Sequence, residues 1–299
     1  MKDFIAIADI DLAKMEELLD SAARLKRERK PRSDLAGKTV ALVFHKPSLR
    51  TRVSFEAGVY ELGGHPMYVT DAEIKMGQRE SVYDIGKVMS RYVHGIMIRT
   101  FAHRNCTELA LASDVPVING LTDLLHPCQV MGDILTCRER GKDVRSMVVA
   151  FIGDGNNVAN SWVEAAGVLP FELRIAGPSG YDPDAGVLAT ARGRGAKVKV
   201  LRDPAEAVSG ADVVYTDVWT SMGQETEKEE RERRFRPYQL NAALLARAKR
   251  DAIALHCLPA HRGEEITDEV MDGPQSAVFD EAENRLHAQK AIMIDLMGR

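Results

Sequence analysis

The segment KPSLRTRVSFE (46–56) combines hydroxyl and guanidinium side chains in a pattern suited to an anion. An apolar run ends just before it, and a Pro-Ser turn leads into a helix that is expected to begin near Thr51. The first turn of a helix offers free backbone N–H groups and the positive end of its dipole. Ser48, Arg50 and Arg52 add donors whose geometry fits phosphate. An ordinary helix cap with two surface arginines fits the same residues, so both interpretations stay open.

The tetrapeptide HPCQ (126–129) stands at a second predicted junction between a strand and a helix. His126 and Gln129 lie one helical turn apart, so an imidazole and a carboxamide can face one ligand, such as a carbonyl oxygen. An isolated His-Pro pair is more often structural, and the motif alone does not decide between these roles.

Three polar motifs follow predicted strands in the second half: IGDGNNVANS (152–161), DVWTSMGQE (217–225) and HCLPAHRGEE (256–265). The glycine spacing of the first differs from GxGxxG, which disfavours a dinucleotide, and its amides suit a small polar ligand. Asp217 is placed to receive an ammonium group. Cys257 is either a buried small side chain or a reactive thiol.

Two periods of apolar residues alternate along the chain and predict the elements that position these motifs. The alternation predicts an α/β fold of two doubly wound domains with parallel sheets, because it restarts near residue 145. A helix over 127–140 is expected to join the domains, and the charge run 225–236 is expected to be a solvated loop or helix face, or part of a mobile lid. Strands are expected at 38–44, 67–69, 95–99, 115–119, 147–153, 171–177, 198–201, 212–218 and 252–258.

The predicted domains comprise residues 1–140, completed by a C-terminal helix over 282–299 that packs back on them, and residues 141–281. That return would bring Arg285 to the first domain, although a surface arginine is the simpler interpretation. Ligands of open α/β sheets bind beyond the carboxyl ends of the strands, where the five motifs lie. The layout suggests an anionic donor on one domain and an amine-bearing acceptor on the other.

The composition excludes several classes of protein. The chain has 299 residues, 45% hydrophobic and 28% charged, which argues against disorder and coiled coil. Its 40 basic and 44 acidic residues give a net charge of −4, so no bulk basic surplus favours nucleic acid. Its apolar runs are shorter than the roughly 20 residues of a membrane helix, and acidic residues interrupt the N-terminus where a signal peptide would be apolar. Four cysteines without CxxC spacing suggest a reduced, cytoplasmic chain.

SLRTR (48–52) resembles the SxRTR carbamoyl-phosphate signature of the aspartate and ornithine carbamoyltransferase family, and the later motifs resemble its ornithine branch. The resemblance covers essentially the whole chain. It implies transfer of a carbamoyl group from carbamoyl phosphate to L-ornithine, giving L-citrulline and phosphate, without metal or organic cofactor. It also implies a homotrimer or an assembly of trimers, and it makes residues 1–140 the carbamoyl-phosphate domain and residues 141–281 the ornithine domain.

The resemblance also assigns residues to the two substrates. Carbonyl attack places negative charge on the carbonyl oxygen, which donors from Arg99 and His126 would stabilise, while Asp217 and Cys257 would position the amine. With Arg50, these four are expected to act in catalysis. The residues implied for ornithine are Asn157, Asp217, Ser221 and Met222, and those implied for carbamoyl phosphate are Ser48, Leu49, Arg50, Thr51, Arg52, Lys75, Arg99, His126, Gln129, Cys257, Leu258 and Arg285.

Two positions depart from the family pattern. Leu49 stands where a threonine is usual, and Lys75 stands where many members carry Gln or His in a loop that reaches a neighbouring subunit. Other substrates, such as N-acetylornithine or putrescine, and a non-catalytic relative of the fold are the alternatives. The HCLPAHRG and SMG motifs favour plain ornithine.

Overall fold

A computed structural model describes residues 1–77, 79–223 and 225–298. The chain forms two compact units, one of Met1–Gly132 with Asn284–Arg299 and one of Asp133–Glu283. Two helices, α6 (Pro127–Glu139) and α13 (Val278–Met297), run through these division points and contribute residues to both units.

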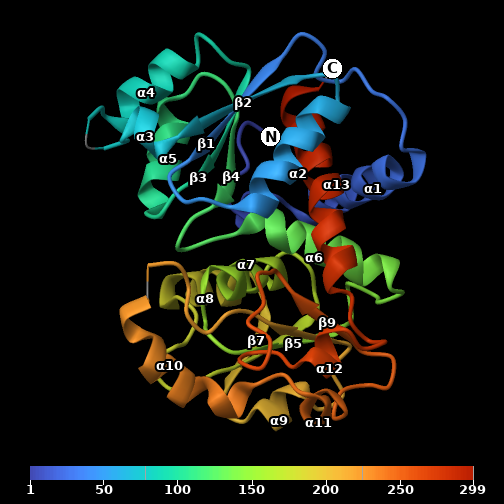
Figure 1. Cartoon of the computed structure of the whole chain (residues 1–299). Helices are drawn as coiled ribbons and strands as arrows, with labels where there is room; N and C mark the ends of the chain where they lie inside the picture. The colour runs from blue at the N-terminus through green and yellow to red at the C-terminus, as the bar shows by residue number, and fades with distance from the viewer. Residues whose placement is uncertain (78, 224, 299) are drawn as a thin grey trace. The chain divides into compact units, whose positions relative to one another are not determined.

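The first unit contains a parallel sheet in the order β2-β1-β3-β4. Figure 1 shows α3, α4 and α5 on one side of this sheet and α1, α2 and α13 on the other. The elements are α1 (Leu12–Glu28), β1 (Thr39–Phe44), α2 (Leu49–Glu61), β2 (His65–Thr70), α3 (Asp71–Ile74), α4 (Val82–Met89), β3 (Gly95–Arg99), α5 (His103–Ala112) and β4 (Val117–Leu121), after a 3-10 turn at Ile7–Asp9.

The core of this unit explains why its strands carry continuous apolar runs. Every residue of β3 and β4 is buried, as expected for strands covered on both faces. On one face Val43 and Ile98 pack with Ile85 of α4 and Leu109 of α5. The carboxyl ends of β1 and β3 therefore lie on a rigid base.

The second unit contains a five-stranded parallel sheet in the order β7-β6-β5-β8-β9. In Figure 1, α7 and α8 lie on one side of it and α9, α11 and α12 on the other. Its elements are β5 (Val148–Ile152), α7 (Asn157–Ala166), β6 (Glu172–Ala176), α8 (Ala185–Gly193), β7 (Lys197–Leu201), α9 (Pro204–Val208), β8 (Val213–Thr216), α10 (Lys228–Phe235), α11 (Ala242–Leu245), β9 (Ile253–His256) and α12 (Asp268–Met271), with 3-10 turns at Glu225–Glu227 and Arg236–Tyr238.

Aromatic residues fill the α7 side of this second sheet. Tyr215 of β8 stacks on Phe151 of β5, with ring centroids 5.2 Å apart, and Trp162 of α7 meets Tyr215 edge-on at 5.9 Å. All three rings are fully buried. The packing holds β8 firmly at the point where its chain continues into the DVWTS segment.

The C-terminal helix packs on the first unit. Its Asn284 accepts a hydrogen bond from Lys26 of α1 at 2.8 Å, and its Lys290 forms an ion pair with Glu61 of α2 at 2.6 Å. A Cβ at Gly132 of α6 would lie 3.1 Å from the backbone nitrogen of Arg285, so glycine permits this close approach.

The predicted fold class, two doubly wound parallel α/β domains with a returning C-terminal helix, is confirmed. All nine predicted strands occur, with ends displaced by a few residues, among the residues that the structure describes. The last helix begins at Val278, earlier than expected, and the charge run contains α10. None of the described helices is long and apolar enough to cross a membrane.

Candidate active site

The β1–α2 junction places a buried hydroxyl at the first turn of a helix. Ser48 is the N-cap of α2, and its side chain accepts a hydrogen bond from the Thr51 backbone N–H at 3.3 Å. This cap orients the first turn so that the Thr51 side chain is fully buried. The apolar run of β1 and the capping serine are thus the local causes of the Thr51 position.

Two guanidinium groups converge on that hydroxyl. Arg99, at the end of β3, donates from Nη1 to Thr51 Oγ1 at 3.2 Å, and Arg285 of α13 donates from Nη2 at 2.9 Å. The Ser48 hydroxyl also donates to the same oxygen, at 3.2 Å. Both arginines are more than nine-tenths buried. Because two buried like charges repel one another, this cluster favours an anionic ligand.

His126 lies in the field of these cations. Burial lowers the pKa of its imidazole well below the usual value, and the charges of Arg285, Arg99 and Lys46 lower it further. The imidazole is therefore neutral at pH 7, so it can donate one hydrogen bond and accept another. Lys46 is itself buried and forms an ion pair with Asp123 at 3.0 Å.

The other residues predicted for carbamoyl phosphate in this unit have different surroundings. Gln129 is fully buried on α6, one turn after His126, and Arg50 is half-buried.

Three further residues predicted for carbamoyl phosphate are exposed. Leu49 is 74% exposed on α2. The exposed Arg52 pairs with Glu56 at 3.0 Å, and its guanidinium lies 3.8 Å from the centroid of the Tyr68 ring. Lys75 is exposed and has left-handed backbone geometry, with φ of 43°.

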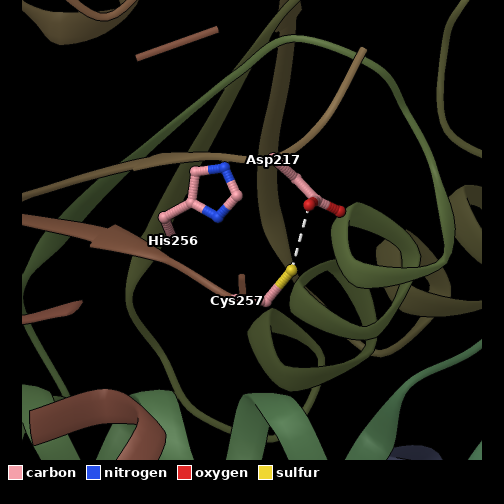
Figure 2. A group of neighbouring side chains, drawn as sticks. All are labelled: Asp217, His256 and Cys257. Carbon is pink, nitrogen blue, oxygen red and sulfur yellow. Dashed lines mark hydrogen bonds between the residues drawn. The ribbon is translucent and has the colours of Figure 1, made fainter. Parts of the chain in front are cut away.

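In the second unit, Asp217 gathers three donors at the end of β8. Its carboxylate accepts from Asn156 Nδ2 at 2.7 Å, from the Val218 backbone N–H at 2.8 Å and from Cys257 Sγ at 3.0 Å. Figure 2 shows the Cys257 thiol directed at this carboxylate. Asp217 is 5% exposed, so the group is a largely desolvated negative charge suited to an ammonium or amine.

The Cys257 thiol stays protonated at neutral pH. Burial raises its pKa well above the usual value, and the Asp217 carboxylate raises it further. A thiol in this state is a hydrogen-bond donor rather than a nucleophile. The geometry therefore favours a positioning role for Cys257 over the reactive-thiol interpretation.

His256 holds the turn that carries Cys257 and Leu258. Its Nδ1 accepts the Leu258 backbone N–H at 2.9 Å, so Nε2 carries the proton and donates to Glu265 at 3.0 Å. The Leu258–Pro259 peptide is cis, and Leu258 has a φ of 59°. The ligand atoms of Asp217, His256 and Cys257 lie within 4.8 Å of one another, but a metal ion there would have to displace one of the bonds to the imidazole.

The GDGNN turn lies beside Asp217. Asn156 caps α7 by accepting from the backbone N–H groups of Val158 and Ala159, at 2.9 and 3.2 Å, while its amide nitrogen reaches Asp217. A Cβ at Gly155 would lie 2.3 Å from the backbone of Asp182 and Pro183, so that glycine serves close packing.

The remaining residues predicted for ornithine flank these groups. Asn157 and Ser221 are half-buried, and Met222 is 46% exposed. The segment that follows β8 is tied down by Arg231 of α10, which donates to the Trp219 carbonyl and to Asp154, both at 2.9 Å. Gln224 and Gln78, which belong to two of the sequence motifs, lie outside the described residues.

Two family models match almost the whole chain. The carbamoyl-P binding domain of aspartate/ornithine carbamoyltransferase matches residues 2–139, and the Asp/Orn binding domain matches residues 145–296. The chain belongs to the aspartate/ornithine carbamoyltransferase family.

Individual members of the carbamoyltransferase family are similar over their full length. The chain is 51% identical to an ornithine carbamoyltransferase of Syntrophus aciditrophicus, covering 98% of each sequence, and 52% identical to one of Syntrophotalea carbinolica, covering 99% of each. The ornithine carbamoyltransferase of Pyrococcus furiosus has a similar structure, with a TM-score of 0.94, 44% identity and coverage of 99% of this chain and 97% of that chain.

Lys46 is a polar residue of this carbamoyltransferase chain to which the sequence assigns no role, and Asn156 has a different partner from the small polar ligand expected for its amide. Lys46 supplies a buried cation beside His126, and Asn156 binds the carboxylate of Asp217. Both stand inside motifs that were singled out, each just beyond the carboxyl end of a strand, and that position was the available signal.

Proposed function

We propose that this chain transfers the carbamoyl group of carbamoyl phosphate to the δ-amine of L-ornithine, giving L-citrulline and phosphate. The observation that carries the proposal is sequence identity of 51–52% with curated ornithine carbamoyltransferases over 98–99% of this chain. The chemistry of the two residue clusters supports it.

Carbamoyl phosphate is assigned to the first unit, within the predicted domain 1–140 and its C-terminal helix. Arg99, Arg285 and Thr51 supply a buried positive cluster that suits a phosphate dianion, and Ser48 and Arg50 border the same helix N-terminus. The neutral imidazole of His126 can donate to the carbonyl oxygen without adding to the repulsion among the cations.

Ornithine is assigned to the second unit, within the predicted domain 141–281, where Asp217 and Asn157 border the turn before α7. Asp217 attracts the substrate's ammonium group, and the Cys257 thiol holds one carboxylate oxygen in place. Cys257 and Leu258 are also assigned to the carbamoyl group, and Ser221 and Met222 to ornithine.

The reaction needs the amine in its neutral form. After the ammonium group loses a proton to water, its nitrogen attacks the carbonyl carbon. The negative charge that develops on the carbonyl oxygen is stabilised by donors from Arg99 and His126. The bond from carbon to the phosphate oxygen then breaks, and the second amine proton leaves with the phosphate or with water. Arg50 and Arg285 favour this step because they bind the departing anion.

The test is a product assay with four acceptors. Purified protein is mixed with carbamoyl phosphate and, separately, with L-ornithine, N-acetylornithine, putrescine and aspartate. Citrulline should form with ornithine, and the other acceptors should give little product. A protein that carbamoylates N-acetylornithine or putrescine instead would support the alternative substrates, and one that gives no product would support a non-catalytic relative.

A homotrimer, or an assembly of trimers, is proposed for the quaternary state. The edge strand β2 and the helix α2 expose apolar side chains, with Met67 at 40%, Val53 at 53% and Leu49 at 74% exposure. A partner subunit often covers exposed apolar side chains of this kind. Lys75 is the residue proposed to reach a neighbouring subunit. Light scattering coupled to size-exclusion chromatography tests this, because a monomer would contradict it.

A cytoplasmic location is also proposed. All four cysteines are free thiols, as expected for a reducing compartment. Fractionation of the source cells with an antibody against the chain would test the location.

A further inference from the structure

Four buried polar groups lie behind the Cys257 turn and have no part in the proposed reaction. They are the Glu281 carboxyl of α13, the Asp133 carboxyl of α6, the Tyr215 hydroxyl of β8 and the backbone N–H of His256 at the end of β9. Glu281, Asp133 and Tyr215 are fully buried and His256 is 1% exposed. All four belong to the second unit.

The hydrogen bonds distribute the donors unequally between the two carboxyls. Glu281 Oε2 accepts from His256 N–H at 2.8 Å, and Glu281 Oε1 accepts from the Tyr215 hydroxyl at 3.0 Å. The Asp133 side chain also forms a hydrogen bond to Glu281. Two carboxylates cannot hydrogen-bond to one another, so this bond requires a proton on one of them.

Two donors, the His256 N–H and the Tyr215 hydroxyl, already point at Glu281, and hydrogen bonds of this kind stabilise the ionised form of a carboxyl group. A proton on Glu281 would weaken both of these bonds, because a neutral carboxyl group is a poorer hydrogen-bond acceptor than a carboxylate. A proton on Asp133 instead gives Glu281 a third donor and weakens neither.

We propose that Asp133 and Glu281 hold one proton between them, carried by Asp133, and that the Glu281 carboxylate is a positioning residue for the turn that presents Cys257 and Leu258. The carboxylate fixes the backbone of His256, and the His256 imidazole in turn fixes the Leu258 N–H. The activity readouts below rest on the proposed function, whereas the spectroscopic readout does not.

The charge of the carboxyl pair also affects the Cys257 thiol. After burial, the acidic groups that raise the pKa of Cys257 are Asp217, to which the thiol donates, and then Glu281 and Asp133 through their charge. A single negative charge in the carboxyl pair therefore helps to keep the thiol protonated, whereas a doubly ionised pair would place a second buried charge beside Asp217 at a large cost in free energy.

The two amide substitutions give opposite expectations. Asp133→Asn replaces the acid's O–H donor with an N–H donor and leaves the charge of the pair unchanged, so kcat/KM for ornithine should stay within about twofold of the parent chain. Glu281→Gln places an N–H₂ group against either His256 N–H or the Tyr215 hydroxyl. Its kcat/KM for ornithine should fall at least about tenfold, with KM for carbamoyl phosphate nearly unchanged.

Infrared difference spectra locate the proton independently of activity. At pH 8 the carbonyl stretch of a buried protonated carboxyl should be present in the parent chain, absent in Asp133→Asn and retained in the control Asp280→Asn. Asp280 precedes Glu281 on the same helix, but it is exposed and pairs with Arg140.

Three results would overturn the proposal. They are an Asp133→Asn variant impaired as much as Glu281→Gln, a Glu281→Gln variant with parental kinetics, and a carboxyl band that survives Asp133→Asn. If Glu281→Gln does not fold, the infrared spectrum of Asp133→Asn still decides where the proton lies, because the band of the protonated carboxyl group should be absent from it. A chain that makes no citrulline contradicts the proposed function and leaves the spectroscopic result to be judged separately.

Discussion

Replacing Thr51 with valine should remove the shared acceptor of the anion cluster while keeping its shape. The Thr51 oxygen accepts from Arg99 and from Arg285, and a hydrogen bond to a charged group is worth about 1.5–3 kcal/mol. Both arginines can recover part of the loss by binding the substrate phosphate directly. We therefore expect a net loss of about 3 kcal/mol in transition-state stabilisation, or about 150-fold in kcat/KM for carbamoyl phosphate.

The matched control is Thr51→Ser, which keeps the hydroxyl and loses only a methyl group. Initial rates with carbamoyl phosphate varied at saturating ornithine give kcat/KM, and calorimetric titration with inorganic phosphate measures the anion site without the reaction. The serine variant should stay within about fivefold of the parent, since it keeps the acceptor. A valine variant within threefold of the parent, or a serine variant as impaired as valine, would refute the role assigned to this oxygen.

Three further predictions follow from the site. His126→Leu removes the oxyanion donor and should lower kcat by about 100-fold or more. It should leave the pH optimum in place, because the parent imidazole is already neutral at pH 7. Since the folded-state pKa of His126 is lowered, the free energy of unfolding should fall below pH 6.5 in the parent and fall less steeply in the variant, as urea midpoints would show. Burial raises the pKa of Asp154 from 3.8 to about 6, so the parent chain should gain up to about 3 kcal/mol of unfolding free energy from this group as the pH falls from 6 to 4, and Asp154→Asn should lack that gain in the same titration. Cys257→Ser keeps a donor to Asp217, so its kcat/KM for ornithine should stay within about tenfold of the parent and its pH–rate profile should be unchanged. Cys257→Ala has no donor and should lose more of its kcat/KM. A displaced pH–rate profile for the serine variant would instead give the thiol a role in proton transfer.

The sequence predicted the elements well because their apolar periods were strong and uninterrupted. Strands such as MVVAFIG stand out since both faces of a parallel sheet are buried. The start of α13 was less predictable. Its first turns include Glu281, which polarity patterns place at the surface but which is fully buried against Tyr215 and His256. Only tertiary contacts give such a carboxyl a reason to be inside.

Some features of the candidate site were likewise predictable from the sequence, and others were not. Motif spacing and resemblance pointed to the arginines, His126 and Asp217, and the structure places several of them in buried clusters. Spacing does not reveal that His126 is neutral, because its lowered pKa depends first on burial and then on the charge of Arg285, which is 159 positions later in the sequence. Nor does it separate the buried Thr51 from its neighbour Arg52, which turns to Glu56 and Tyr68 on the exposed side of the helix.

The register of α13 has an evolutionary consequence. Arg285 and Lys290 are five residues apart on one helix, and each is committed to its own partner in the first unit, Arg285 to Thr51 and Lys290 to Glu61. Each residue turns an α-helix by about 100°, so a single insertion or deletion between them would remove one of the two from its partner. Substitutions can accumulate one at a time on this helix, but length changes between residues 285 and 290 should be absent from functional homologues.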